Sequence, residues 1–381
     1  MKVDAEVVAR KWARRVFDLR FHRSHRLQAT AIHRTLEGYL GKTRRADIER
    51  ADAYAHDVLG HLRYAPWLYV YSAVAGRFKE GWIPDNYYGY VVVPKLKGGY
   101  GIASSLKSLQ RAIFDSDAFP DLAYFANGLF LAPDATVVSP EALARRLFSQ
   151  NDSVVFKVDN SLQGRGIFFF DRATFDLEKI RTLGNGVFQE NIVQHEVLAR
   201  FAPRSVATLR MTTAVDDSGV VSIRACYLRL GRDADTHVQS SSHVRIPVDC
   251  ATGELAESGY LTDWTVVREH PDSKIPFAGV KIPAFDDCLT SVLAHHRKVP
   301  YARCVGWDVA VADDGRVQLM EWNAEHNDIK FSEATQGPCF ADLRWDLLVP
   351  RRHAAPQVAA SAPAPVPVPQ GEAGTGLTKS L

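Results

Sequence analysis

Apolar residues follow two periods along the chain, and the period changes part of the way along it. Through residue 62 they recur every three or four positions, as at Trp12, Val16 and Leu19, which predicts amphipathic helices. The aromatic run at 64–71 predicts buried packing in the same region. Beyond residue 150, short apolar runs rich in Val, Ile and Phe predict strands instead. We therefore expect an α+β protein preceded by a helical amino-terminal region.

Turn and cap residues place the boundaries of the expected elements. Ser139 followed by Pro140 predicts a helix start, with Ser139 as the N-cap and Pro140 at the first helical position. A helix is also expected from residue 104 or 105 through Phe114, after the glycine-rich turn at 98–101. The predicted strands are Tyr88–Val93, Val154–Val158, Ile167–Phe170, Val187–Val193, Thr208–Val215 and Val220–Leu230.

The stretch at 306–323 is typical of a β-hairpin. Apolar residues alternate on both sides of an Asp-Gly pair, which is a strong signal for a tight hairpin turn. With Asp314 and Gly315 as the two turn residues, Asp308 pairs with Glu321. Their Cβ atoms would lie roughly 5 Å apart on one face, an arrangement that is destabilising for like charges.

A cation between these two carboxylates would remove the repulsion. Strand alternation places Asn323 on the same face as Glu321 and opposite Gly306, which has no side chain to fill the space. Oxygen ligands around an open cavity suit Mg²⁺, which proteins hold through one or two carboxylates together with substrate phosphates. Asp308, Glu321 and Asn323 are therefore candidate metal ligands. The alternative is a surface hairpin with solvated acids.

A second candidate feature is the loop between the strands predicted at 154–158 and 167–170. It reads Ser-Leu-Gln-Gly-Arg-Gly from Ser161 to Gly166, and backbone N–H groups of such a loop can approach a phosphate closely. Lys157, on the strand that enters the loop, can supply a positive charge to the same phosphate. Glycine-containing hairpin loops are common, so a purely structural loop is the alternative.

The overall composition limits the class of protein. The 381 residues are 46% hydrophobic and 24% charged, with a formal net charge of +2, which gives no argument for a nucleic-acid partner. Five cysteines occur without C-x-x-C spacing, so neither a disulfide framework nor a zinc site is indicated. No apolar run reaches the ~18 residues that a membrane span needs. A cytoplasmic, reducing location is expected.

Charge is unevenly distributed, because residues 1–50 hold 13 Lys and Arg against 6 Asp and Glu. On amphipathic helices this excess produces a basic outer face. The simplest interpretation is a solvated surface. The alternative is attraction of the basic helices to an anionic membrane surface or to a polyanionic substrate.

The order of charged residues over 100–345 resembles the ATP-grasp superfamily. In D-alanine:D-alanine ligase and its relatives, the metal-binding residues have the spacing D-x12-E-x-N, which is the spacing of Asp308, Glu321 and Asn323. The segments between residues 227 and 253 look most like the sugar-transfer-associated branch of the superfamily. The resemblance implies an ATP-grasp fold, in which two α+β lobes grip ATP.

The resemblance also implies roles for individual residues. The family's two ATP-binding lysines correspond to Lys107 and Lys157. The tripeptide at 208–210 is similar to a strand of ribosomal-protein glutamate ligases whose Arg faces phosphate or the acyl phosphate, which implies a catalytic role for Arg210. Lys157, as the family's lysine on the first strand of the central lobe, is the other implied catalytic residue. The implied nucleotide-binding set is Lys107, Lys157, Ser161, Gly164, Arg165, Gly166, Gln189, Glu190, Ile192, Val193 and Glu196.

Within this set, the hinge strand of the family would contact the base and the sugar of the nucleotide. Glu190 and backbone groups of Ile192 and Val193 would bind adenine, and Glu196 would bind ribose. The implied cofactors are ATP and two Mg²⁺ ions, for which Mn²⁺ can substitute.

The implied activity is an ADP-forming carboxylate–amine ligase that makes an amide through an acyl phosphate, in cell-surface polysaccharide or related metabolite biosynthesis. Its partners would be a small-molecule or saccharide-linked carboxylate and an amine, without nucleic acid. A kinase acting on a sugar or another hydroxyl, and a nucleotide-binding regulator of a polysaccharide assembly complex, are the alternatives. Departures from the family pattern at 239–242 and 324–326 fall where the acceptor should bind, so the sequence does not identify the carboxylate or the amine.

These expectations divide the chain into four parts. Residues 1–85 form the basic helical region, 86–150 form a lobe that precedes the ATP-grasp core, and 151–350 form the ATP-grasp lobes. Residues 351–381 are rich in Pro and Ala and are expected to be a disordered tail.

Overall fold

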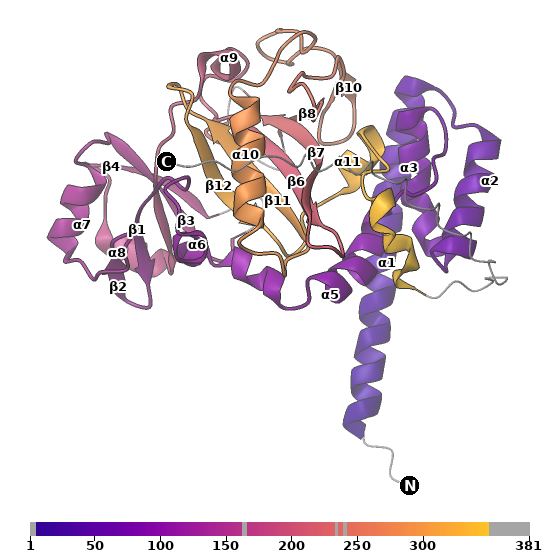
Figure 1. Ribbon diagram of the computed structural model, residues 1–381, viewed down its shortest axis with the longest axis horizontal. Helices are drawn as coiled ribbons and strands as arrows, with labels where there is room; N and C mark the ends of the chain where they lie inside the picture. Colours follow the sequence, from indigo (N-terminus) through magenta and orange to yellow (C-terminus); the bar gives the residue numbers. More distant parts are fainter. Residues whose placement is uncertain (1–4, 162–165, 233–234, 239–241, 350–381) are drawn as a thin grey trace, which may run out of the picture.

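The computed structural model describes residues 5–161, 166–232, 235–238 and 242–349. Within them, a five-stranded small sheet has the order β2-β1-β5-β3-β4, and a seven-stranded large sheet has the order β10-β9-β8-β7-β6-β11-β12. Figure 1 shows the large sheet between the small sheet on the left and the helical region on the right. The expected α+β class with a helical amino-terminal region is confirmed. The predicted tail at 351–381 lies outside the described residues.

The helical region buries its aromatic residues, as predicted. Trp67, Leu68 and Tyr71 of α3 are fully buried, because α3 packs against α1 on one side and against α11 on the other. The helices and turns that precede the first strand are α1 (Ala5–Leu40), α2 (Arg45–Ala53), η1 (Tyr54–Val58), η2 (Leu62–Tyr64), α3 (Ala65–Ala75), α4 (Asp85–Tyr87), η3 (Tyr88–Val92), α5 (Val93–Leu96), η4 (Tyr100–Ser105), η5 (Lys107–Leu109) and α6 (Gln110–Phe114).

Two of the secondary-structure predictions for this part of the chain are wrong. The segment 88–93, predicted as a strand, is the π-helical turn η3 followed by α5. The Pro84 carbonyl accepts from the amide of Tyr88 and so continues a helix there, and a short buried apolar run suits a helix as well as a strand. The single helix expected over 104–114 is broken at Leu106, whose φ and ψ are −93° and 80°.

The small sheet contains the predicted glycine-loop hairpin, because β3 pairs antiparallel with β4 on one edge and with β5 on the other. Helix α7 begins where predicted, since the Ser139 hydroxyl accepts from the amide of Ala142. The strand predicted over 187–193 leaves the sheet after Glu190. The elements are β1 (Asp121–Ala126), β2 (Leu129–Leu131), α7 (Pro140–Leu147), β3 (Ser153–Val158), β4 (Ile167–Asp171), α8 (Leu177–Leu183) and β5 (Gly186–Glu190).

The boundary expected at 150/151 falls inside this sheet. Strands β1 and β2 precede residue 151, and β1 pairs with β5. Segments on both sides of the expected boundary therefore share one sheet and one hydrophobic core.

The large sheet carries the two long strands predicted near its middle, β6 and β7, which pair with each other. Helix α10 runs across one face of this sheet, over β6 and β11 (Figure 1). The elements are α9 (Glu196–Ala199), β6 (Thr208–Val215), β7 (Val221–Leu230), β8 (Val244–Val248), β9 (Gly259–Tyr260), β10 (Val266–Val267), α10 (Phe285–His296), β11 (Cys304–Val311) and β12 (Val317–Asn323).

Strands β11 and β12 form the predicted hairpin, with Asp308 opposite Glu321 as expected. The turn itself differs from the prediction. Three residues, 313–315, connect the strands, and the amide of Ala312 donates to the carbonyl of Arg316 at 2.9 Å. A three-residue turn by itself would move the pairing by one position.

A second offset restores the predicted pairing. Between Asp308 and Val309 the register shifts by one residue, which makes Met320 an extra residue on β12 and creates a β-bulge. The longer turn and the bulge cancel each other. As a result Gly306 faces Asn323, and the two carboxyl groups share one face of the sheet.

After β12 the chain returns to the helical region through α11 (Lys330–Thr335), η6 (Ala341–Leu343) and η7 (Trp345–Leu348). Glu333 joins the two parts. Its carbonyl accepts from the Trp82 indole at 2.8 Å, and its carboxyl oxygens accept from the amides of Ile83 and Cys339, each at 2.7 Å. The helical region and the carboxyl-terminal segment therefore share a polar connection in addition to a hydrophobic core.

Stability is expected to fall as the pH rises through about 7 because of Glu333. Burial raises the pKa of this carboxyl from 4.5 to about 7, although the amides of Ile83 and Cys339 oppose the shift. The folded state then binds the proton more tightly than the unfolded state does. The stabilisation is fully present below pH 4.5 and is lost as the pH rises through the folded-state pKa of about 7.

Urea unfolding of the wild-type chain and of Glu333→Gln at pH 5 and pH 8 measures this contribution. The glutamine does not titrate, so its packing cost is the same at both pH values. The stability advantage of the wild-type chain should shrink by about 2 kcal/mol at the higher pH. Glu257→Gln, at an exposed position, is the matched control. An advantage of equal size at both pH values would contradict the assignment.

Candidate active site

A cleft with a volume of about 1120 Å³ brings most of the predicted site residues together. Its walls come from both sheets, from the segment 190–194 that connects them, and from Gln28 of α1. Ligand pockets commonly occupy roughly 300–1,000 Å³, so this volume has room for a nucleotide and a second substrate. The predicted residues that line the cleft are Lys107, Lys157, Ser161, Gln189, Glu190, Ile192, Val193, Arg210, Asp308, Glu321 and Asn323.

The other predicted residues are not part of this lining. Gly164 and Arg165 lie outside the described residues. Glu196, expected at the ribose, is the first residue of α9 and is not among the residues that line the cleft. Gly166 has a φ of 73°, and a Cβ there would come within 2.8 Å of Ser161 Cβ. Gly166 therefore has a structural role at the end of the loop.

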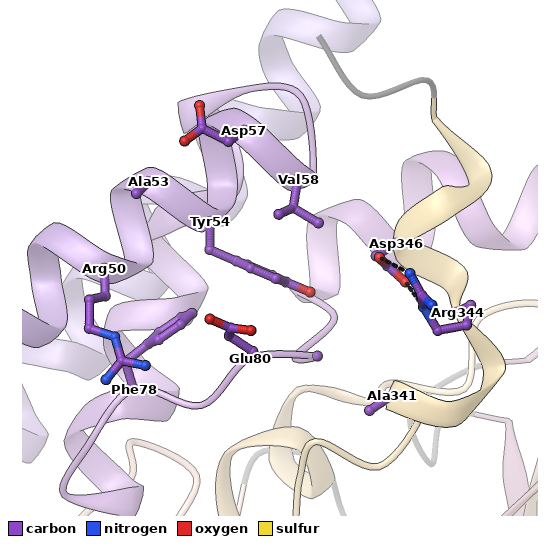
Figure 2. Close-up of a pocket in the computed structure, with 11 residues that line it drawn as sticks. Arg50, Ala53, Tyr54, Asp57, Val58, Phe78, Glu80, Ala341, Arg344 and Asp346 are labelled. Atoms are coloured by element: carbon purple, nitrogen blue, oxygen red, sulfur yellow. Dashed lines mark hydrogen bonds and ion pairs between the residues drawn. The ribbon is translucent and has the colours of Figure 1, made fainter. Parts of the chain in front are cut away.

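A smaller cavity of about 450 Å³ lies between the helical region and the carboxyl-terminal turns (Figure 2). Its lining has three acids, Asp57, Glu80 and Asp346, against two arginines, Arg50 and Arg344. Arg344 pairs with Asp346 at 3.2 Å, and Arg50 lies over an aromatic ring at 5.3 Å. An excess of acids repels a polyphosphate, so the larger cleft is the candidate nucleotide site.

Asp308 is held by two arginines in the cleft wall. One carboxyl oxygen accepts from Nε of Arg210 at 2.5 Å, and the other forms an ion pair with a terminal nitrogen of Arg229 at 2.6 Å. Burial alone would raise the pKa of Asp308, but the two guanidinium groups outweigh burial and hold it below its usual range. The space opposite Asn323 is not open as expected. Arg210 passes over Gly306, where a Cβ would come within 3.2 Å of the arginine side chain.

Glu321 has the opposite electrostatic setting. Burial raises its pKa and the carboxylate of Asp308 raises it further, while Lys107 and Lys157 oppose the shift. The hairpin therefore has the like-charge conflict that its register predicts. Asn323 lies beside the pair, and its amide nitrogen donates to the carbonyl opposite it at 3.2 Å.

This donor set suits a hard cation. Two carboxyl groups and an amide provide oxygen ligands of the kind that Mg²⁺ prefers, and a cation would offset the repulsion that raises the pKa of Glu321. Within the described residues, no cluster of three or more His, Cys, Asp and Glu could hold a metal by itself. The residues therefore fit a cation that is completed by the Asn323 amide and by substrate phosphates.

Two lysines add positive charge to the same cleft. Lys157 lies on β3, between two paired strands, and is 6% exposed. Burial lowers its pKa, and Glu321 is the group that most opposes this shift. Nζ of Lys107 donates to the Ser161 carbonyl at 3.1 Å. The positive charges of Lys107 and Lys157 thus act on Glu321, which lies across the cleft on the large sheet.

The segment after β5 connects the two sheets beside the cleft. The amide of Asp313 donates to the Val193 carbonyl at 2.9 Å, and the amide of His195 donates to the Val311 carbonyl at 2.9 Å. Because the Val193 carbonyl already accepts this hydrogen bond, an adenine base would contact Val193 through its amide N–H. Glu190 is the last residue of β5 and lines the cleft, which is compatible with the expected adenine contact.

Gln189 is engaged inside the small sheet. Its amide nitrogen donates to the Asp121 carboxylate at 2.8 Å, and the same carboxylate accepts from Gln110 at 2.9 Å and from Tyr124 at 3.0 Å. With 1% of its surface exposed, Gln189 orients the end of β5. The geometry therefore favours a positioning role over the expected nucleotide contact.

Arg229 is a candidate that the sequence pattern does not select. β6 and β7 pair so that Thr208 lies opposite Arg229, and strand alternation then places Arg229 on the same face as Arg210. The presence of an arginine on each of two consecutive predicted strands is a signal in the sequence that could have pointed to Arg229. Only the strand register shows that both reach Asp308.

The lining also includes residues from β8, from the segment after β12 and from α1. Arg245 lies over the ring of Trp264 at 4.9 Å, and Lys330 pairs with Asp328 at 2.7 Å. These residues line the cleft together with Gln28. The part of the wall that borders the helical region therefore combines an arginine on an aromatic ring with a lysine–aspartate ion pair, a feature that the sequence did not predict.

A family model described as sugar-transfer associated ATP-grasp matches residues 182–342. This range contains the large sheet with Arg210 and the carboxyl pair, whereas Lys107 and Lys157 lie outside it. The resemblance to the ATP-grasp superfamily and to this branch is confirmed over the matched range, which is less than half of the chain. No curated protein matches the sequence.

Several solved ATP-grasp and related enzymes share weak structural similarity with the chain. The ATP-grasp ligase PsnB with a minimal precursor has 14% identity and a TM-score of 0.34, over 60% of this chain and 55% of that chain. N5-carboxyaminoimidazole ribonucleotide synthetase from Thermotoga maritima has 10% identity and a TM-score of 0.34, over 68% and 54%. L-amino acid ligase from Bacillus licheniformis has 11% identity and a TM-score of 0.37, over 64% and 48%. The chain thus spans about half the length of these structures.

Proposed function

We propose that the protein is an ATP-dependent, ADP-forming carboxylate–amine ligase that works through an acyl phosphate, in cell-surface polysaccharide or related metabolite biosynthesis. The observation that carries the proposal is the meeting of Lys107, Lys157 and Arg210 with the carboxyl pair Asp308 and Glu321 in one cleft. The carboxyl pair and Arg210 lie within the range that matches the sugar-transfer associated ATP-grasp family.

The reaction has two displacements. A carboxylate oxygen of the substrate attacks the γ-phosphorus of ATP, the bond from that phosphorus to the bridging oxygen breaks, and ADP leaves. The amine then attacks the acyl carbon, the bond from this carbon to the phosphate oxygen breaks, and phosphate leaves while the nitrogen loses a proton. Neither displacement needs a protein nucleophile, so the protein contributes position and charge.

Each charged residue of the cleft has a place in this scheme. Lys157 and Lys107, on the side of the small sheet, offset the charge of the phosphates. Arg210 offsets the charge on the phosphoryl group or on the acyl phosphate, and its bond to Asp308 fixes its direction. Glu321 and Asn323 would hold Mg²⁺ with Asp308, and the ion would supply Lewis-acid stabilisation of phosphate charge.

The wall that borders the helical region is proposed as the acceptor side. Arg245 lies over the ring of Trp264, and the positive charge of its guanidinium group behind this wall suits an acidic or saccharide-linked substrate. Several polar groups of this wall are already paired, as Lys330 is with Asp328. The acceptor would therefore be recognised by shape as well as by charge.

Hydroxylamine trapping tests the reaction type. The protein is incubated with ATP, Mg²⁺ and hydroxylamine against a panel of amino acids, uronic acids and short hydroxy acids, without an amine. An acyl phosphate is electrophilic at carbon, so the correct acid should give a hydroxamate in an amount equal to the ADP formed. Glu321→Gln should give neither product.

Other product sets would reject the ligase. ADP together with a stable phosphate ester and no hydroxamate would identify a kinase, because a phosphorylated hydroxyl offers no acyl carbon. AMP and pyrophosphate would reject transfer of the γ-phosphoryl group altogether. Nucleotide binding without turnover across the full panel, with the amines added, would favour a regulatory nucleotide site.

A further inference from the structure

Helix α1 has two different faces along its length. Asp18, His22, His25, Ala29 and Ile32 follow helical spacing and face the body of the protein. Ala29 and Ile32 are buried, and the Asp18 carboxylate accepts from the Tyr90 hydroxyl at 2.9 Å. The part of α1 that precedes Asp18 projects away from the body of the molecule, and Figure 1 shows no other described element beside it.

The opposite face, which we call the outer stripe, consists of Trp12, Val16, Leu19, Arg23 and Leu27. These positions repeat at intervals of four, three, four and four residues, so they lie on one side of the helix. Trp12 is 68% exposed, Leu19 is 72% exposed and Leu27 is 59% exposed. Large apolar side chains at such exposure leave this face without a partner among the residues that the structure describes.

Basic residues lie within the outer stripe, at Arg23, and on both sides of it, at Arg15, Arg20 and Arg26. Arg15, Arg20, Arg23 and Arg26 are exposed, and none of them has a carboxylate within ion-pair distance among the residues that the structure describes. The acid of this segment, Asp18, is turned to Tyr90 on the other face. The outer stripe therefore presents apolar groups together with uncompensated positive charge.

We propose that the outer stripe of α1 binds the protein to an anionic lipid surface. A basic helix with exposed aromatic and aliphatic residues lies in the plane of the bilayer interface, with the apolar groups in the acyl boundary and the arginines at anionic headgroups. Tryptophan in particular is enriched at this depth. Among the described residues no helix is both long and apolar enough to cross a membrane, so α1 would lie on the surface.

Two other occupants fit the outer stripe less well. A second copy of the chain would bring Arg15, Arg20 and Arg23 against the same arginines, and this repulsion opposes an isologous contact. A soluble polyanion would neutralise the arginines but would leave Trp12 and Leu19 in water. A lipid surface is the partner that satisfies both the charge and the apolar area.

The consequence for the protein concerns the position of the cleft. Gln28 of the same helix lines the cleft and follows Leu27 of the outer stripe directly in sequence. Binding through the outer stripe would thus hold one wall of the cleft close to the membrane surface. The proposal does not depend on the reaction proposed above, because lipid binding is measured without nucleotide.

Vesicle co-sedimentation of the full chain tests the proposal. Vesicles of phosphatidylcholine with 30 mol% phosphatidylserine are compared with vesicles of pure phosphatidylcholine. We expect binding to the anionic vesicles that weakens when the salt is raised from 0.1 M to 0.5 M, because screening shortens the range of the attraction. Binding to pure phosphatidylcholine should be at least tenfold weaker.

Variants separate the apolar and basic contributions. Arg15→Gln/Arg20→Gln/Arg23→Gln should weaken binding about 100-fold, at about fivefold for each arginine. Trp12→Ser/Leu19→Ser should weaken it at least tenfold. The matched control is Leu129→Ser/Val220→Ser, at apolar positions that are 49% and 59% exposed elsewhere, and it should bind like the wild-type chain. Circular dichroism and melting temperature check that each variant is folded.

Fluorescence gives a readout at the outer stripe itself. The seven tryptophans of the chain are reduced by one in Trp12→Phe, so the difference between the two proteins reports Trp12. Brominated phosphatidylcholine in the anionic vesicles should quench this difference signal. Trp12 that stays unquenched while the protein sediments would show attachment through another surface and would overturn the proposal.

Three further results would also overturn it. These are equal binding to neutral and anionic vesicles, unchanged binding of both outer-stripe variants, and absence of binding at 0.1 M salt. A folded chain that ignores vesicles but binds heparin through the same arginines would identify a soluble polyanion as the partner. A concentration-dependent dimer that Trp12→Ser/Leu19→Ser disrupts, without vesicle binding, would identify a second copy.

Discussion

Glu321→Gln is expected to lower ATP turnover at least ~100-fold, because one metal ligand supplies several kcal/mol of transition-state charge stabilisation. The fold should remain intact. Burial and the Asp308 carboxylate already raise the pKa of Glu321, so the folded protein gains by removing this negative charge. ADP release and the melting temperature are measured on the same preparation. ADP release should fall, whereas the melting temperature should stay the same or rise.

A matched substitution on the same hairpin is Asp314→Asn. Asp314 lies in the turn, where it pairs with Arg316 and its side chain is 49% exposed. It should keep normal turnover and lose less than about 1 kcal/mol, as exposed ion pairs do. Near-normal turnover in folded Glu321→Gln would remove Glu321 from the proposed metal site.

Asp308→Asn is expected to be destabilising as well as inactive. Asp308 is the partner of both Arg210 and Arg229, and the three side chains are 7%, 9% and 16% exposed. An amide leaves two buried guanidinium groups without a counter-charge, and breaking a buried pair in this way typically costs about 3–5 kcal/mol. Urea unfolding at neutral pH should show this loss, and ADP release should be abolished.

Comparing Asp308→Asn with Glu321→Gln separates the structural role of one carboxyl group from the metal-binding role of the other. Loss of stability in Asp308→Asn but not in Glu321→Gln would agree with the arginine contacts of Asp308, since no arginine among the described residues pairs with Glu321. Adding Arg229→Gln to Asp308→Asn should recover part of the lost stability, because one uncompensated charge is removed. Equal loss in both single variants would contradict the different electrostatic settings of the two carboxyl groups.

Local patterns were sufficient where the residues concerned are neighbours along the chain or across one turn. The start of α7 at Ser139 depends on a hydroxyl and an amide three residues apart. The β3–β4 hairpin joins two predicted strands that a short glycine-containing loop connects. In both cases the partners of the interaction belong to the same short stretch of the chain.

The β11–β12 hairpin shows how a correct result can depend on more than the pattern. The expected two-residue turn at Asp314 and Gly315 places Asp308 opposite Glu321. The chain reaches the same pairing with a three-residue turn and a bulge at Met320. The two offsets of one residue cancel, so the predicted pairing is correct although the predicted turn is not.

The sequence by itself determined the α+β class, most strands, the carboxyl pair on β11 and β12, and the basic character of the amino-terminal helix, because each is written in short-range periodicity or spacing. Only the tertiary structure decided that Arg229 reaches Asp308, that Gln189 is bound to Asp121, and that β1 and β2 share a sheet with β3. It also decided that no described part of the chain covers the outer stripe of α1. The physical reason is that contacts between distant segments depend on strand register and on which faces become buried. Strand register and the choice of buried faces both depend on the free energy of packing the whole chain, and a short window of sequence does not contain that information.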